Sequence, residues 1–485
     1  MFSLEETLRG VQPVDARREP VLPAALRQVA FSEAVIDSRL ATPGALFVAL
    51  RGERVDGHDF LGGAASQGAR GALVRREMVG RAALDRPWAV VEPEGVAEGI
   101  SPDAFLLIPV DDPLAALQRL AAYHRGLFAP TVIGITGSGG KTSTKEVAAA
   151  VLSRRYRTLK NPRSYNSEAT LPISLLQLGD QHAVAVLEMG AYGPGDIALL
   201  AGIARPQIGI VTNVGYSHME RMGSFEVVAQ TKSELVRALP ADGVAVLNYD
   251  DERVRAMAAV TPARPFFYGL DPAADLWADE IESRGLEGIA FQVHYRGESL
   301  HLKLPLIGRH SVHTALAASA VGLLLDMGWD EIVEGLRDES AALRLLAVPG
   351  INGATLIDDT YNASPASSLA ALNLLAELNG RRIAALGDML ELGHLEEEAH
   401  RKVGARAAEV ADLLVTVGPR ARWIADEARL AGMPAERITV TDSNDVAVTV
   451  LRGLLQPGDH LLVKGSRGMA MESIIAALQA PQPAP

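Results

Sequence analysis

The sequence predicts an α/β protein in which helices cover mostly parallel sheets. The 485 residues are enough for about three domains. Short apolar runs rich in β-branched residues alternate with longer helical segments over much of the chain, which is typical of parallel sheets. The segment 131–146, TVIGITGSGGKTSTKE, combines a strand, a glycine turn and a helix start. We therefore predict a small N-terminal α/β domain, a central P-loop domain and a C-terminal Rossmann-like domain.

The composition limits the kind of protein and its surroundings. A hydrophobic content of 48% with 22% charged residues is ordinary for a globular enzyme. The net charge of −13 argues against a non-specific nucleic-acid or membrane-surface binder. The chain has no cysteine, which excludes disulfides and fits a reducing cytosol. Because we find neither a signal peptide nor an apolar run long enough to cross a bilayer, we expect a cytoplasmic protein.

Residues 1–109 form the first predicted domain. In this region short strands alternate with Gly and Pro turns, and Asp37, Ser38 and Arg39 follow one of the strands. Taken alone, such a triplet is most simply turn chemistry. The boundary at 109 lies within LLIPVDDP, where Asp112 before Pro113 predicts the start of a helix.

Residues 110–335 form the second predicted domain, which contains the glycine turn. TVIGIT predicts a buried strand, and a helix is expected from Thr142 to about residue 152. In a P-loop, Lys141 reaches the β- and γ-phosphates of a nucleotide and the Thr142 hydroxyl binds Mg²⁺. The spacing departs from the common form, because Ile135 stands where the first glycine is usual.

Three further polar residues follow predicted elements of this domain. AVAVLEMG predicts a strand that ends in Glu188, where a Mg²⁺ ligand belongs. IGIVTNVGYSHME predicts a strand that ends near His218, and the helix FEVVAQTKSELVRAL carries Lys232. Without other context, a helix lysine is usually a solvated surface charge.

Residues 336–485 form the third predicted domain, a second doubly wound fold. ATLIDDTYNASPASSLAAL predicts a strand, a polar turn and a helix that starts at Pro365, and RRIAALGD predicts a strand that ends in Asp388. HLLVKGSRG predicts a strand followed by a helix from Met469, and the tail APQPAP is expected to be disordered. Polar residues thus gather at strand ends, where such folds bind ligands.

Several of these motifs together resemble the ATP-dependent Mur ligase family of bacterial cell-wall synthesis. The resemblance covers nearly the whole chain and rests on the order of its motifs: DSR, PGALFVAL, DGHDF, TGSGGKTST, EMG, NVGYSHME, TKSE, GRH, DDTYNASP, GDMLELG and VKGSRGMAMES. Within the family, GDMLELG and YNASP favour the member that adds a dipeptide over the members that add one amino acid.

The resemblance implies an ADP-forming ligase of peptidoglycan synthesis. It implies that ATP activates the terminal carboxylate of UDP-N-acetylmuramoyl tripeptide as an acyl phosphate, which the amine of D-alanyl-D-alanine then attacks. It also implies two Mg²⁺ ions, a carbamylated lysine at Lys232, small-molecule substrates, no nucleic acid, no membrane insertion and a monomer.

The resemblance also implies roles for individual residues. Catalysis and metal binding fall to Lys141, Thr142, Glu188, His218 and Lys232. Nucleotide contacts fall to Thr136, Gly137, Ser138, Gly139, Gly140, Lys141, Thr142, Ser143, His310, Thr314, Arg344 and Asp359. Contacts to the UDP-linked substrate fall to Ser38, Arg39, Asn166 and Ser167, and contacts to the dipeptide fall to Tyr361, Asn362, Ser364 and Asp388.

Some positions depart from the family pattern, and other functions stay open. Ser311, Thr314 and Ser364 stand where the family usually has asparagine, and Thr170 replaces a usual glycine. The alternatives are a ligase that adds a single third amino acid, a folylpolyglutamate-type ligase, and a non-catalytic UDP-sugar-binding protein with the same fold. The intact residues at the predicted phosphate and metal positions argue against the last alternative.

Overall fold

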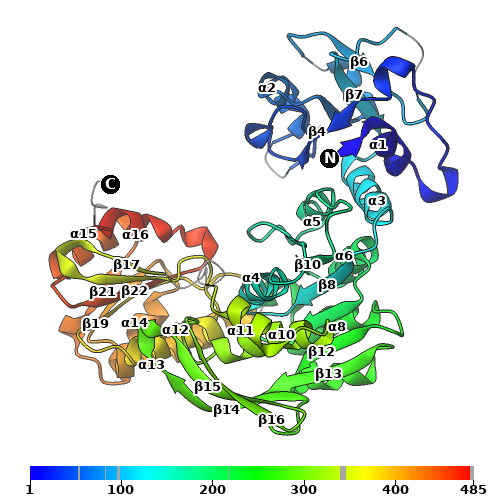
Figure 1. The fold of residues 1–485 in the computed structure, drawn as a ribbon. Coiled ribbons are helices and arrows are strands. Elements are labelled where there is room, and N and C mark those ends of the chain that lie inside the picture. The colour runs from blue at the N-terminus through cyan, green and yellow to red at the C-terminus, as the bar shows by residue number, and fades with distance from the viewer. Residues whose placement is uncertain (53–54, 82, 96–98, 217, 339–345, 481–485) are drawn as a thin grey trace. The chain divides into compact units, whose positions relative to one another are not determined.

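The computed structural model describes residues 1–52, 55–81, 83–95, 99–216, 218–338 and 346–480. In these residues the strands form three large sheets and one two-stranded pair, and helices pack against the sheets, so the predicted α/β class is confirmed (Figure 1). By its contacts the chain divides into two compact units. The first unit is Met1–Gly134, Tyr156–Gly190 and Asp196–Gln207, and the second is Ile135–Arg155, Ala191–Gly195 and Ile208–Pro485.

The first large sheet is wholly parallel and has the strand order β3-β4-β5-β7-β6. Its strand β7 is buried at every position, as expected for a parallel strand covered on both faces. β7 ends one residue beyond the predicted boundary at 109. The elements of this region are β1 Phe2–Ser3, α1 Leu4–Val11, β2 Ala30–Phe31, β3 Ala34–Val35, β4 Leu46–Val48, α2 Leu61–Ser66, β5 Gly71–Arg75, β6 Trp88–Val90 and β7 Phe105–Val110.

The second sheet has the strand order β16-β15-β14-β13-β12-β11-β8-β10-β9. Its strands are β8 Thr131–Thr136, β9 Thr158–Lys160, β10 Val184–Glu188, β11 Ile208–Val211, β12 Val244–Asn248, β13 Arg264–Gly269, β14 Leu276–Ser283, β15 Ile289–Tyr295 and β16 Glu298–Leu304. The accompanying helices are α3 Pro113–Arg125, α4 Lys141–Leu152, α5 Thr170–Leu175, α6 Asp196–Ala204, α7 Met219–Met222, α8 Phe225–Arg237, α9 Glu252–Arg255, α10 Ser311–Leu324 and α11 Trp329–Leu336.

One edge of this sheet was not predicted from the sequence. Strand β15 runs antiparallel to both of its neighbours, β14 and β16. The turn between β15 and β16 is Arg296–Gly297, and both residues have positive φ angles, 50° and 83°. Two such residues form the tight turn that joins antiparallel strands, so the parallel sheet ends in a hairpin.

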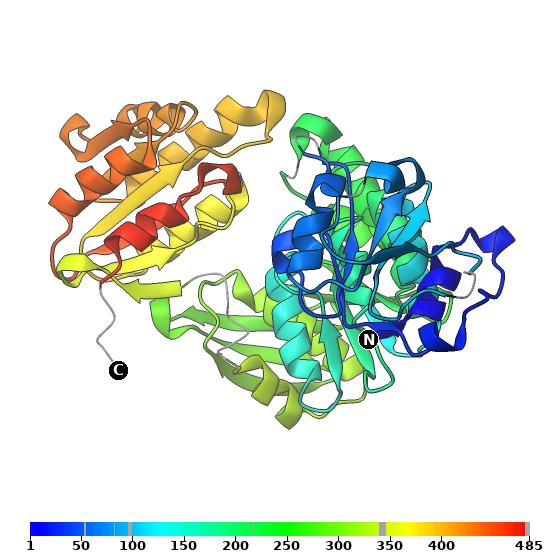
Figure 2. The ribbon, with the colours of Figure 1, turned by 90° about the horizontal axis from the view of Figure 1, so that it is seen from above.

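The third sheet has the order β17-β18-β22-β19-β20-β21 and is parallel except for β17. One apolar core joins it to α12, α13 and α14, and another joins it to α15 and α16; Figure 2 shows helices on both faces. The elements are β17 Leu346–Pro349, β18 Thr355–Asp358, α12 Pro365–Ala376, β19 Arg382–Gly387, α13 Glu396–Val410, β20 Leu413–Val417, α14 Arg422–Leu430, β21 Ile438–Thr441, α15 Asn444–Leu454, β22 His460–Lys464 and α16 Glu472–Leu478.

Most elements around the predicted site form as expected, with two corrections. β8, α4, β10, α8 and the start of α12 at Pro365 confirm the predictions. The last helix begins at Glu472 rather than Met469, because Ala470 has a φ of +48° and interrupts the chain between them. The second correction, to the end of β11, is explained with the site.

No helix in the described ranges is long and apolar enough to cross a membrane. The predicted disorder of the Pro-rich tail concerns mainly residues 481–485, which lie outside the described residues. The boundaries predicted at 109 and 335 remain a proposal.

Candidate functional site

The glycine turn between β8 and α4 has a shape that other residues rarely adopt. Gly137 has a φ of +146°, and a Cβ atom added there would lie 1.9 Å from the Thr212 hydroxyl oxygen. Gly140 has a φ of +76° and immediately precedes the first residue of α4. Because L side chains rarely adopt such angles, these glycines determine how the chain turns into the helix.

The segment that follows β11 holds this turn in place. The Gly139 amide donates to the Asn213 side-chain oxygen at 2.8 Å, and the Ser138 amide donates to the Asn213 carbonyl at 2.9 Å. The Gly215 amide donates to the Ser138 hydroxyl at 2.9 Å. We call residues 137–141 together with 212–215 the phosphate loop. These bonds explain why β11 ends at Val211 and why a strand reaching His218 was wrong: residues 212–215 bond to the turn instead of continuing the strand.

Lys141 and Thr142 lie at the amino end of α4. The Lys141 ammonium donates to the Gly137 carbonyl at 2.9 Å, so it bends back across the turn. Thr142 is buried and Ser143 is partly buried. Thr136, the last residue of β8, is also buried. A helix amino end beside a glycine turn and a lysine can bind phosphate groups.

His218 and Lys232 lie near Lys141. Burial lowers the pKa of His218, the Lys141 and Lys232 ammonium groups act in the same direction, and the Glu391 carboxylate opposes them. The Nδ1 atom of His218 lies 2.5 Å from a Glu391 carboxylate oxygen. Lys232 on α8 is only 1% exposed, so the interpretation of Lys232 as a solvated surface charge is wrong.

The ring of His218 also contacts an aromatic side chain. Its centroid lies 4.7 Å from that of Tyr192. His218 has a φ of +48°, an uncommon value outside glycine. Neither Tyr192 nor Glu391 was predicted from the sequence, since each lies far along the chain from the histidine.

Glu188 belongs to the first unit and ends β10. Its side chain is buried and accepts a hydrogen bond from the Asn166 side-chain amide at 2.6 Å. The backbone of Glu188 exchanges two hydrogen bonds, each of 3.0 Å, with the side chain of Asn161. Ser167 bonds through its hydroxyl to that of Thr170, the first residue of α5, at 2.9 Å. Asn161, which directly follows β9, was not predicted as a site residue.

Ser38 and Arg39 lie in a short turn after β3. The Asp37 carboxylate accepts from the Arg39 amide at 3.0 Å and from its guanidinium at 2.6 Å. The hydrogen bond from the Arg39 side chain lowers the pKa of Asp37, and burial opposes this effect. The Asp37 side chain therefore stabilises a turn, as the simplest interpretation predicted. The exposed Arg39 guanidinium can also contact a ligand.

The residues expected on the adenine side lie at the start of α10. His310 precedes this helix, and Thr314 is half-buried on it. Burial lowers the pKa of His310, and the nearby Lys464 ammonium acts in the same direction. The residue as a whole is exposed, so we expect the shift to be small. Arg344 lies outside the described residues.

The polar turn after β18 is held by a lysine from β22. The Lys464 ammonium is buried and donates to the Asp359 carboxylate at 2.7 Å and to the Asn362 carbonyl at 2.9 Å. Tyr361 lies between these two residues in the chain and is exposed. Lys464 was not predicted as a site residue. A lysine at the end of an apolar strand is unusual, and this position could have indicated it.

Ser364 and Asp388, both predicted to contact the dipeptide, have partners within the protein. The Ser364 hydroxyl accepts from the Ser367 amide at 3.3 Å and caps α12. Asp388 is buried and accepts from the Ala421 amide at 2.7 Å. Burial raises the pKa of Asp388, and the Ala421 amide opposes the rise. Their side chains therefore support neighbouring helices.

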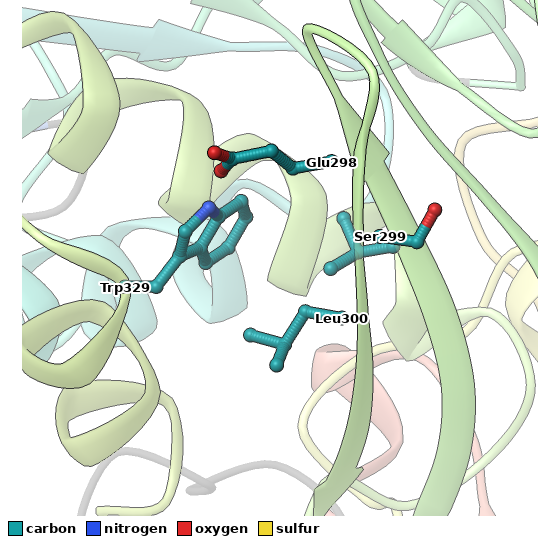
Figure 3. Close-up of a pocket in the computed structure, with 5 residues that line it drawn as sticks. Glu298, Ser299, Leu300 and Trp329 are labelled. Atoms are coloured by element: carbon teal, nitrogen blue, oxygen red, sulfur yellow. The ribbon is translucent and has the colours of Figure 1, made fainter.

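A surface pocket lies elsewhere in the second unit (Figure 3). It is lined by Val293, Glu298, Ser299, Leu300 and Trp329. None of the predicted site residues lines it, so we attach the chemistry to the phosphate loop.

Comparison with known proteins agrees with the order of the motifs. Three family models match: the Mur ligase family catalytic domain over residues 32–125, the Mur ligase middle domain over 135–322, and the Mur ligase glutamate ligase domain over 343–467. A relative from Mycobacterium bovis, UDP-N-acetylmuramoyl-tripeptide–D-alanyl-D-alanine ligase, is 37% identical over 473 residues, covering 92% of this chain and 91% of the relative.

Solved structures of Mur ligases are also similar to this chain over nearly its whole length. MurF from Acinetobacter baumannii superposes with a TM-score of 0.80 at 29% identity, covering 98% of both chains. MurF from Thermotoga maritima in complex with ADP gives a TM-score of 0.74 at 26% identity, covering 92% of this chain and 96% of that one. Since the family models span all three sheets and the relative is similar over nearly the whole chain, this protein belongs to the Mur ligase family.

Proposed function

We propose that this chain is the ADP-forming ligase that joins D-alanyl-D-alanine to UDP-N-acetylmuramoyl tripeptide. The observation that carries the proposal is the phosphate loop, in which Lys141 bends over a glycine turn at the amino end of α4. The 37% identity to a named ligase of this kind over 92% of the chain supports the choice of substrates.

The reaction has two steps and needs no protein nucleophile. The terminal carboxylate of the tripeptide attacks the γ-phosphorus of ATP, and ADP leaves. The amine of D-alanyl-D-alanine then attacks the acyl carbon, phosphate leaves, and the amine gives up a proton. In the first step two anions meet, so the protein must position them and supply positive charge. In our proposal Lys141 contributes this charge at the β- and γ-phosphates.

The residue types at the predicted metal positions fit a role in Mg²⁺ binding. Mg²⁺ keeps several waters and takes few protein ligands beside substrate phosphates. The described residues contain no cluster of three His, Asp or Glu side chains. Thr142, Glu188 and His218 are the proposed ligands. The bound ions would neutralise charge on the transferring phosphate.

Lys232 is the proposed site of carbamylation. The buried Lys232 and Lys141 both act on the partly buried His218 ring, so two ammonium groups lie where a cation should bind. A carbamate replaces the ammonium of Lys232 with an anion, which can bind or orient a metal ion. The burial of Lys232 and its nearness to His218 support this proposal.

The remaining proposed contacts are those to the UDP-linked substrate, the nucleotide and the dipeptide. We propose that Ser38, Arg39, Asn166 and Ser167 contact the UDP-linked substrate, that Thr136, Gly137, Ser138, Gly139, Gly140, Ser143, His310, Thr314, Arg344 and Asp359 contact the nucleotide, and that Tyr361 and Asn362 contact the dipeptide. Ser364 and Asp388 would act on the dipeptide indirectly, by supporting the turns beside it. We also propose that the enzyme acts on these small-molecule substrates as a monomer in the cytoplasm.

A coupled assay of ADP release tests this function against its alternatives. Release should require both UDP-N-acetylmuramoyl tripeptide and D-alanyl-D-alanine, and the product mass should equal the two substrates less one water. Release with a single amino acid and a UDP-muramoyl dipeptide, or with glutamate and a folate, would favour one of the other ligases. Binding of the UDP substrate without any ADP release would favour the non-catalytic alternative.

A further inference from the structure

Arg467 differs from most arginines of the third sheet region in having no acidic partner. Between residues 346 and 480, seven arginines pair with carboxylates: Arg381, Arg382, Arg401, Arg406, Arg420, Arg422 and Arg429. In the same described range, Arg437, Arg452 and Arg467 form no ion pair. An unpaired guanidinium is of interest only if it lies where a ligand binds.

Of these three, Arg467 alone follows the carboxyl end of a strand. Arg437 immediately precedes β21, and Arg452 lies near the end of α15, which leads into β22. Arg467 comes three residues after the end of β22. Ligands of parallel α/β sheets bind beyond the carboxyl ends of the strands.

The position of Arg467 is fixed by two neighbouring segments. Its amide donates to the Asn362 side-chain oxygen at 3.4 Å, and its guanidinium carbon lies 5.2 Å from the centre of the Tyr361 ring. The preceding residue, Ser466, accepts from the Leu390 amide at 2.8 Å and donates its own amide to the Asp388 carbonyl at 3.0 Å. We call residues 359–363, 388–391 and 464–467 the strand-end cluster.

The other cations of this cluster and its surroundings are occupied. Lys464 donates to Asp359 and to the Asn362 carbonyl. Arg420 pairs with Glu396 at 2.8 Å and lies 3.8 Å from Asp388. Among the described residues of the cluster, the exposed Arg467 guanidinium therefore remains available for an anion from outside.

We propose that Arg467 binds the carboxylate of the incoming dipeptide, an inference that rests on the proposed function. D-alanyl-D-alanine carries its reactive amine at one end and a free carboxylate at the other. A planar guanidinium binds a carboxylate through two parallel hydrogen bonds. The Tyr361 ring supports the guanidinium from one side, so Arg467 selects an amine that carries a carboxylate at the correct separation.

Steady-state kinetics with two dipeptides tests the inference. The substrates are D-alanyl-D-alanine and D-alanyl-D-alaninamide, which lacks the charge. Wild-type protein should show a KM for the amide about 10- to 100-fold higher than for the acid, the range expected for a charge-assisted pair. R467A should raise the KM for the acid by a similar factor and leave that for the amide unchanged. R467K, which keeps the charge without the planar fork, should be intermediate.

The control is R422A, which removes an exposed arginine already paired with Asp442 and should change neither KM. Thermal unfolding of each variant shows whether the fold is retained. The inference is overturned if active wild-type protein does not distinguish the two dipeptides, or if R467A raises both dipeptide KM values equally or raises only the KM for ATP. Wild-type protein that releases no ADP with D-alanyl-D-alanine would overturn the proposed function as well.

Discussion

The phosphate loop and the strand-end cluster both follow parallel strands, yet different forces shape them. The phosphate loop is shaped by its backbone, through glycines with positive φ and amides that donate to Asn213. The strand-end cluster is shaped by side chains from distant segments, as in the bond between Lys464 and Asp359, which are 105 residues apart. A small change in backbone geometry should therefore be enough to impair the function of the phosphate loop. In the strand-end cluster, by contrast, each substitution should remove one contact and lower stability or selectivity by the contribution of that contact.

The largest effect is expected from removing the cation of the phosphate loop. K141A should lower the rate of ADP release by about 10²- to 10³-fold, the loss typical of one preorganised group against a charged transition state. Its fold should be retained, because Lys141 bonds to the turn rather than filling the core. K402A, which removes an exposed lysine on α13, is the control. A K141A variant with near wild-type ADP release would contradict the P-loop assignment.

A second large effect is expected at Lys232. If this side chain carries a carbamate, K232A should lose roughly 10²-fold or more in rate and regain part of it with formate or acetate, which can refill the anionic position. K145A is the matched control, because Lys145 is equally buried but pairs with Glu146 at 2.9 Å. We expect no carboxylate rescue for K145A. A fully active K232A variant, with an unmodified lysine in an experimental map of the wild type, would disprove the modification.

A glycine substitution tests how strictly the backbone shapes the phosphate loop. In G137A the new Cβ would meet the Thr212 hydroxyl at 1.9 Å, at a φ of +146°. We expect a loss of about 1–3 kcal/mol in the free energy of unfolding and weaker ADP binding by calorimetry. G202A is the control, because Gly202 lies in α6 with nothing within 4 Å of its added Cβ. It should be more stable by about 0.5–1 kcal/mol, so the two alanines should act in opposite directions.

The same contrast explains which parts could be predicted from the sequence. The turn at Gly137–Gly140 and the helix that begins at Lys141 are local, and their residue types require the conformation that was found. The segment after Val211 looked like a continuing strand, because its residues carry no mark of the bonds that they make to Ser138 and Gly139. The hairpin of β15 and β16 was missed for a different reason. Its turn, Arg296–Gly297, lies outside the motifs that were used to predict the site.

The strand-end cluster could be predicted only in part. Tyr361, Asn362 and Asp388 stand at strand ends in the sequence, and the structure has them there. Whether a polar side chain faces a ligand or caps a helix depends on contacts that only the folded chain provides, as at Asp388 with the Ala421 amide. Lys464 and Arg467 were missed instead: both lie in the motif HLLVKGSRG, but neither was predicted to have a role in the site.

The smallest effect is expected at Ser364, where a substrate contact and a helix cap make different predictions. The hydroxyl accepts from the Ser367 amide and sits directly before Pro365, the first residue of α12. If it acts as a cap, S364A should lower the free energy of unfolding by about 1 kcal/mol, while S364N should be nearly neutral, because asparagine caps helices as well as serine does. The KM for D-alanyl-D-alanine should be unchanged in both variants. A raised KM in S364A, without loss of stability in chemical denaturation, would instead place this hydroxyl on the dipeptide and make the strand-end cluster a site of direct contacts.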